Sequence, residues 1–197
     1  MDTEFKPQDK TEIRKLFPEI ELISSDEIKE GVTKVWIKAW RGGGWDRVEH
    51  APLMIRDIHD PSVGVQHIRV SVKLALAIAE ILELEMGQTL NRDYLIAGAL
   101  LHDVGKALEY APRGQGPLTG SELRHSVSGA HFVLEVGLPM EIAHIVATHS
   151  KEGVLYDKSL EAEVVSRAEL LAWEVTCRQK FGIPGSRYVE GAPVTKG

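Results

Sequence analysis

The chain has 197 residues, 26% charged and 43% hydrophobic, which is enough for one sizeable core, so we expect a single domain over residues 1–197. Its formal net charge of -6 argues against nucleic acid as a partner, and no apolar stretch approaches the length of a membrane span. The N-terminus lacks the apolar segment of a secretory signal and the single cysteine, Cys177, cannot form an internal disulfide, so we expect a cytoplasmic protein.

The first predicted element is an amphipathic helix that follows a flexible N-terminus at residues 1–10. Ser24 and Glu27 have the spacing of a capping box, and apolar residues then recur at helical spacing. The glycines at 42–44 end this helix. The segment RGGGWD at 41–46 lacks the lysine and the hydroxyl residue of a phosphate-binding P-loop, so we interpret it only as a helix end.

Two further helices carry polar residues into an apolar setting. Residues 67–83 are apolar on nearly every side, which is typical of a buried central helix. Residues 91–105 form the next predicted helix, which delivers His102 and Asp103 at its C-terminal end. A second His-Asp pair, His59-Asp60, precedes a proline and is predicted to lie in a loop.

The second half of the chain also has helical patterns. We expect helices at about 121–135, 139–149 and 159–180, followed by an extended tail at 182–197 that is rich in helix breakers. No run shows the sustained alternation of a strand. The predicted architecture is therefore an all-α helical bundle.

Helical geometry places several histidines on buried faces. His67 shares a stripe with Leu74, and His149 shares one with Ile145. His144 lies roughly 140° away around the same helix as His149 and is the poorer ligand candidate. The buried imidazoles require partners, because burying such groups unpaired costs several kcal/mol.

A carboxylate on the last predicted helix joins this set, because Glu169 lies outside the charged arc of that helix. Buried imidazoles and carboxylates from different helices can stabilise one another through a shared divalent cation. Mixed ligands of this kind suit Fe, Mn, Ni, Zn or Mg, with one or two ions bound. The predicted ligands are His67, His102, Asp103, His125, His149 and Glu169.

The order H...HD...H...H...acid resembles the HD superfamily of metal-dependent phosphohydrolases over about residues 60–175. His67 matches the first histidine of that family, and His102-Asp103 in the segment HDVGK matches its motif doublet. The resemblance implies an all-α HD-domain bundle with a metal site at its centre. Its last ligand is usually Asp after Ala, whereas this chain has Glu169.

The resemblance also implies how the ligands are divided between two metals. His67, His102, Asp103 and the late acidic residue would hold the first metal. Asp103 would bridge to a second metal held by His125 and His149.

The implied activity is hydrolysis of a phosphomonoester or phosphodiester of a small, nucleotide-like substrate by metal-activated water. Asp103 and Lys106 are the expected catalytic residues, since Lys106 is near enough in sequence to place its ammonium against phosphoryl oxygens. Two alternatives stay open: a di-iron oxygenase of the same superfamily and a metal-stabilised sensing domain without turnover. The C-terminal tail leaves a homodimer open as well.

Overall fold

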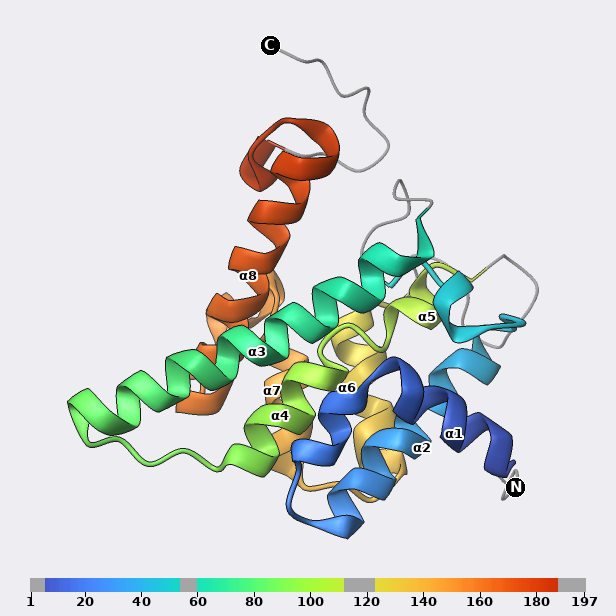
Figure 1. The fold of residues 1–197 in the computed structure, drawn as a ribbon, viewed down its shortest axis with the longest axis horizontal. Coiled ribbons are helices and arrows are strands. Elements are labelled where there is room, and N and C mark those ends of the chain that lie inside the picture. Colours follow the sequence, from blue (N-terminus) through green and yellow to red (C-terminus); the bar gives the residue numbers. More distant parts are fainter. Residues whose placement is uncertain (1–5, 54–59, 112–122, 188–197) are drawn as a thin grey trace.

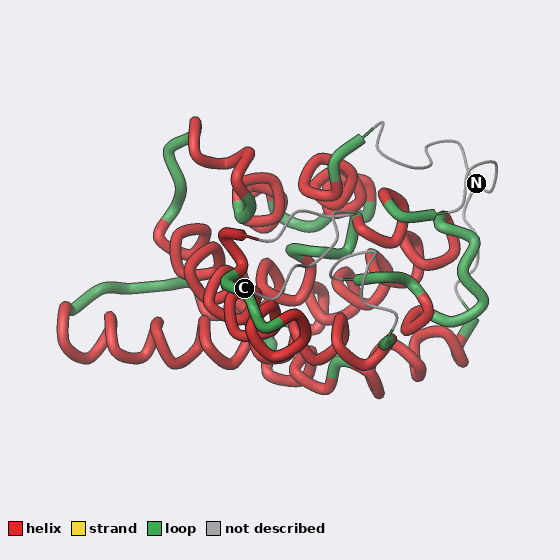
Figure 2. The backbone as a smooth tube through the Cα atoms, turned by 90° about the horizontal axis from the view of Figure 1, so that it is seen from above, coloured by secondary structure: helices red, strands yellow, loops and turns green. Residues whose placement is uncertain are grey.

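The structure is a computed structural model, and it describes residues 6–53, 60–111 and 123–187. These residues form helices joined by loops, with no strand among them, so the predicted all-α class is confirmed (Figure 2). The α-helices are α1 (Pro7–Leu16), α2 (Asp26–Gly42), α3 (Pro61–Met86), α4 (Arg92–Leu101), α5 (Lys106–Glu109), α6 (His125–Glu135), α7 (Met140–Thr148) and α8 (Leu160–Phe181). Short 3-10 turns are η1 (Pro18–Leu22), η2 (Val48–His50), η3 (Lys151–Leu155) and η4 (Gly185–Arg187).

Side-chain caps mark the starts of α2, α3, α4 and α8. In each, a side-chain oxygen accepts a hydrogen bond from a backbone N–H of the first turn, and the capping residues are Ser25, Asp60, Asn91 and Ser159. The predicted capping box at Ser24 is wrong by one residue. Ser24 instead donates from its backbone N–H, at 2.7 Å, and from its hydroxyl, at 3.0 Å, to Asp93, which ties the start of α2 to α4.

The long helix α3 crosses the molecule, and α8 packs against it (Figure 1). On the inner side α4 contacts α3, α7 and α8, while α6 and α7 pack against each other. On another side of this group α2 contacts α4 and α6, η1 contacts α4, and α1 packs against α2 and η1. The helix predicted at 67–83 is confirmed as the middle of α3, but its predicted burial on nearly every side is wrong, because Val70 is 37% and Ile81 60% exposed. No helix in the described part of the chain could cross a membrane.

The ends of the described chain differ from the sequence-based expectation. Residues 7–10, expected to be flexible, form the first turn of α1, because Asp9 is buried there against Arg41 of α2. At the other end, Gly185–Arg187 forms η4, within the segment expected to be an extended tail. Residue His59 of the second His-Asp pair lies outside the described residues, and its neighbour Asp60 caps α3.

Two glycines allow α4 and the turn after it to approach α6 and α7 closely. A Cβ at Gly98 would lie 2.5 Å from the side chain of Ile145 in α7. A Cβ at Gly105 would lie 2.2 Å from the backbone oxygen of His125, the first residue of α6. No larger side chain fits at either position without movement, so the glycines hold the His102-Asp103 turn against the helix that carries His125.

Candidate metal centre

Five ionisable side chains from four segments meet inside the bundle. His67 lies in the second turn of α3, His102 and Asp103 directly follow α4, His125 opens α6, and His149 directly follows α7. Each of the five is at most 5% exposed. Four of the five side chains therefore come from the ends of helices, and only His67 comes from within a helix, α3.

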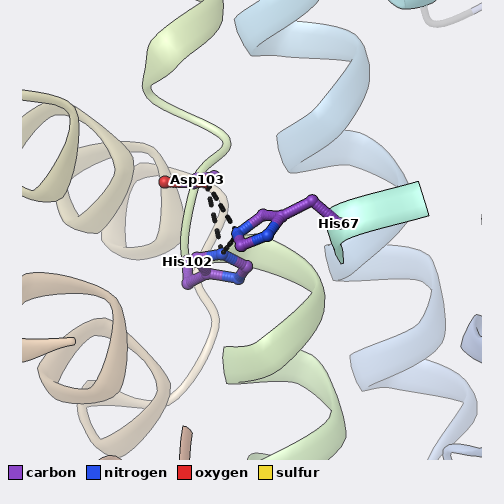
Figure 3. Close-up of side chains that lie close together, drawn as sticks. All are labelled: His67, His102 and Asp103. Carbon is purple, nitrogen blue, oxygen red and sulfur yellow. Dashed lines mark hydrogen bonds and ion pairs between the residues drawn. The ribbon is translucent and has the colours of Figure 1, made fainter. Parts of the chain in front are cut away.

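Asp103 and the first two histidines form one compact group (Figure 3). The Nε2 atoms of His67 and His102 face each other at 3.3 Å. The Oδ2 atom of Asp103 lies 3.5 Å from His67 Nε2 and 3.3 Å from His102 Nε2. The three atoms thus surround a common point.

A second group shares the same aspartate through its other oxygen. The Nε2 atoms of His125 and His149 also lie 3.3 Å apart. Oδ1 of Asp103 lies 3.5 Å from the first and 3.7 Å from the second. The carboxylate of Asp103 therefore points one oxygen at each pair of imidazoles.

The partners of the outer ring nitrogens indicate which nitrogen carries the proton in three of the four histidines, His102, His125 and His149. Nδ1 of His102 and Nδ1 of His149 each lie 2.7 Å from a backbone carbonyl oxygen, which can only accept. Nδ1 of His125 lies 2.8 Å from a carboxylate oxygen of Glu109. In neutral His125 and His149 the inner Nε2 atoms then carry lone pairs, which face each other at 3.3 Å, and a cation between them would stabilise this arrangement.

This arrangement fits a divalent metal. Two nitrogen ligands bound at about 2.0–2.1 Å with tetrahedral angles stand about 3.3–3.4 Å apart, which matches both imidazole pairs. Imidazole nitrogen together with carboxylate oxygen is a donor set for Zn, Fe, Mn or Ni. The residues present can therefore hold one metal at each pair, with Asp103 between them.

Burial and charge both act on the acid and base groups of the centre. Burial lowers the pKa of His67 to about 3 and that of His125 to about 4, which keeps both rings neutral. Burial also opposes a charge on His102, but the Asp103 carboxylate outweighs it and raises the pKa of this ring. For Asp103 the cost of burial is offset by Lys106 and His102, which hold its pKa well below the usual range.

Lys106 is the first residue of α5 and reaches back into the centre. Its Nζ donates to Oδ2 of Asp103 at 2.9 Å, and its side chain is 11% exposed. The ammonium thus lies on the same side of Asp103 as His67 and His102. Its positive charge acts on the ring of His67 as well as on the carboxylate of Asp103.

The structure does not bring the remaining predicted ligand, Glu169, into either compact group of ligand atoms. It lies on α8 close enough to interact electrostatically with His149 and His102, and burial raises its pKa. Glu169 therefore faces the other ligands, as predicted, but lies outside both compact groups of ligand atoms. His144, the poorer candidate, instead accepts a hydrogen bond from the backbone N–H of Ser159 at 3.1 Å.

Glu109, at the end of α5, is a residue that the sequence analysis missed. It is 4% exposed, and its Oε2 accepts hydrogen bonds from the backbone N–H of His125 at 2.7 Å and from the ring Nδ1 at 2.8 Å. Its other oxygen accepts from Arg124. Burial opposes the Glu109 charge, but these donors outweigh it and lower its pKa. The segment is one short helical turn, so periodicity offers no signal for such a contact.

Comparison with known proteins agrees with this geometry. The HD domain family matches residues 64–174. Dihydroneopterin 2',3'-cyclic phosphate phosphodiesterase from Methanocaldococcus jannaschii is 35% identical over 127 residues, which cover 62% of this chain and 51% of that protein. The chain thus spans about half the length of this relative. No solved structure is a significant match.

Proposed function

The chain belongs to the HD domain family, and from that premise we propose that it is a metal-dependent phosphohydrolase of a small, nucleotide-like phosphate ester. The observation that carries the proposal is Asp103, whose two oxygens each face one pair of buried imidazoles. The relative named for acting on dihydroneopterin 2',3'-cyclic phosphate supports the choice of a phosphate ester as substrate.

The ligands would divide at Asp103. His67, His102 and Asp103 would hold one divalent cation, and Asp103, His125 and His149 the other. When bound, the cations supply hydroxide at neutral pH and neutralise charge on phosphate oxygens.

The protein's own residues orient and stabilise the reacting groups. Hydrogen bonds from the outer nitrogens of His102 and His149 to backbone carbonyls fix the ring orientations. The Lys106 ammonium would stabilise the negative charge that grows on the phosphoryl oxygens in the transition state. Deep burial of the imidazoles strengthens these interactions, because little water competes with them.

A cavity beside the centre would accommodate the organic part of such a substrate. It lies between α3 and α8, has a volume of about 320 Å³, and His67 forms part of its wall. Val70 and Leu74 give it apolar sides, while Gln66 and Gln179 provide amide groups. Apolar walls with a few polar groups are typical of small-molecule sites.

The test is hydrolysis by protein purified without added metal and then loaded separately with Mn²⁺, Fe²⁺, Ni²⁺, Zn²⁺ or Mg²⁺. The substrates are nucleoside monophosphates, nucleoside 2',3'-cyclic phosphates and dihydroneopterin 2',3'-cyclic phosphate, and products are followed by ³¹P NMR. We expect metal-dependent cleavage of at least one ester, abolished in His102→Ala. If no metal supports cleavage of any ester, the proposal is wrong.

The same samples separate the two alternatives. Oxygen consumption by the iron-loaded protein, without phosphate ester cleavage, would identify an oxygenase. Tight binding of a phosphorylated compound without any turnover would identify a sensing domain.

A further inference from the structure

The four buried histidines differ in what holds their outer ring nitrogens. For His102 and His149 the partner is the backbone carbonyl of the residue three positions earlier, which any helix end can supply. The outer nitrogen of His67 has no hydrogen-bond partner among the described residues. Of the four, only His125 has a carboxylate at its outer nitrogen among the described residues, and that carboxylate belongs to Glu109.

Glu109 binds His125 at two points with a single oxygen. Oε2 accepts from both the backbone N–H and the ring Nδ1, so backbone and ring are fixed relative to each other. Both residues are at most 5% exposed, which excludes competing water. The inner Nε2 of His125 is thereby aimed at Asp103 and His149.

A carboxylate partner changes a histidine ligand more than a carbonyl partner does. The negative charge makes the hydrogen bond charge-assisted and increases the electron density on the opposite ring nitrogen. A cation at Nε2 of His125 is therefore bound more strongly than it would be with a neutral partner. The first imidazole pair has no such support.

We propose that Glu109 is a positioning residue that gives the two cation positions unequal affinities. The affinity of the position formed by Asp103, His125 and His149 depends on Glu109. The affinity of the position at His67 and His102 does not. This rests on the metal-binding part of the proposed function. Glu109 contacts the outer Nδ1 of His125 and not the inner Nε2 that would bind the cation.

Arg124 and Glu152 complete the surroundings of Glu109 and offer a control. Arg124 donates to Glu109 and, from Nε at 2.9 Å, to Glu152. Glu152 thus shares the arginine with Glu109, while its other carboxylate oxygen accepts from Ser150. The Glu152→Gln variant removes a similar charge from the same network without removing the carboxylate that holds His125.

The test is metal binding by equilibrium dialysis against Mn²⁺ or Zn²⁺, with no phosphate ester present. For Glu109→Gln we expect one of the two binding events to weaken about 10- to 100-fold, while the other stays near that of the wild type and the circular dichroism of the metal-free variant shows that it is folded. Glu152→Gln should retain both affinities within about threefold. Equal weakening of both events in Glu109→Gln, or no weakening, would overturn the proposal.

A measurement on the wild type covers the case in which Glu109→Gln does not fold. In zinc-loaded protein with ¹⁵N-labelled histidine, Nδ1 of His125 should carry a proton that resonates further downfield than those of His102 and His149. A metal-bound Nδ1 on His125, or a proton resonance like the other two, would contradict the role of Glu109. Failure of the wild type to bind any metal would instead refute the proposed metal centre itself.

Discussion

The two sides of Asp103 are built differently. On the Oδ2 side lie His67, His102 and the ammonium of Lys106, and Nδ1 of His67 has no hydrogen-bond partner among the described residues. On the Oδ1 side lie two histidines whose outer nitrogens are both held, one by Glu109 and one by a backbone carbonyl. We infer that the Oδ2 side, with the Lys106 ammonium, stabilises negative charge on the substrate. The Oδ1 side, with its two oriented imidazoles, binds a cation more tightly. The experiments below separate the two sides.

Removing the carboxylate that both sides share should have the largest effect. Asp103→Asn keeps the size of the side chain but removes its charge, so we expect loss of both bound metals. A metal contributes several kcal/mol to the transition state, and each 1.4 kcal/mol is a factor of ten, so kcat should fall by about 10³-fold or more. Elemental analysis and ester hydrolysis measure the two effects.

The control for that variant is His131→Asn, whose imidazole is 68% exposed on α6. It should bind metal and turn over like the wild type. Retention of two metals by Asp103→Asn would show that the aspartate does not join the two sides.

Lys106→Met tests the Oδ2 side alone. Loss of one positive charge from the transition state should lower kcat by about 10²-fold or more, while the metal content stays unchanged. Lys151→Met, at an exposed residue of η3, is the matched control. An unchanged kcat in Lys106→Met would mean that the ammonium serves only to pair with Asp103.

Glu169→Gln and Glu109→Gln should lower metal affinity on opposite sides of Asp103. If a cation at His67 and His102 draws the Glu169 carboxylate toward itself, loss of the charge should weaken binding there about tenfold. Dialysis with the double variant Glu109→Gln/Glu169→Gln should then show both events weakened. Equal affinities in the wild type and Glu169→Gln would remove Glu169 from the ligand set.

The smallest expected effect is the acid sensitivity of the metal-free protein. Buried His67 and His125 have pKa values of about 3 and about 4, below the ordinary 6.5, so the unfolded chain binds more protons as the pH falls from 6.5 toward 4. The free energy of unfolding must then decrease over this window. A loss of 1 kcal/mol lowers the unfolding midpoint of a chain of this size by about 2–4 °C.

Thermal unfolding in EDTA between pH 7.5 and 4.5 measures this slope. His125→Asn should flatten it, and His131→Asn should leave it unchanged. A slope that is the same in His125→Asn and the wild type would contradict the burial of a neutral ring at this position.

Helical periodicity predicted the inward faces of His67 and His149, because each shares a stripe with apolar neighbours and the structure buries both. It could not predict Glu109, since a four-residue helix is shorter than two helical turns and its partner His125 lies 16 positions further along the chain. The helix face on which a residue lies also does not determine its distance from side chains on other helices. Glu169 lies on the expected side of α8 but outside the compact groups of ligand atoms.

The start of α2 illustrates another limit of local sequence rules. Ser24 and Ser25 both have the chemistry of a helix cap, and only the tertiary contact between Ser24 and Asp93 decides that Ser25 takes the role. Similarly, the polar segment 7–10 was expected to be flexible, but Asp9 forms an ion pair with Arg41 of α2.

The central claim is that Asp103 holds a cation on each side, and anomalous X-ray scattering from crystals grown with Mn²⁺ or Zn²⁺ tests it most directly. We predict two anomalous peaks, one within ligand distance of His67, His102 and Oδ2, and one within ligand distance of His125, His149 and Oδ1. A single peak, or peaks away from these side chains, would contradict the account.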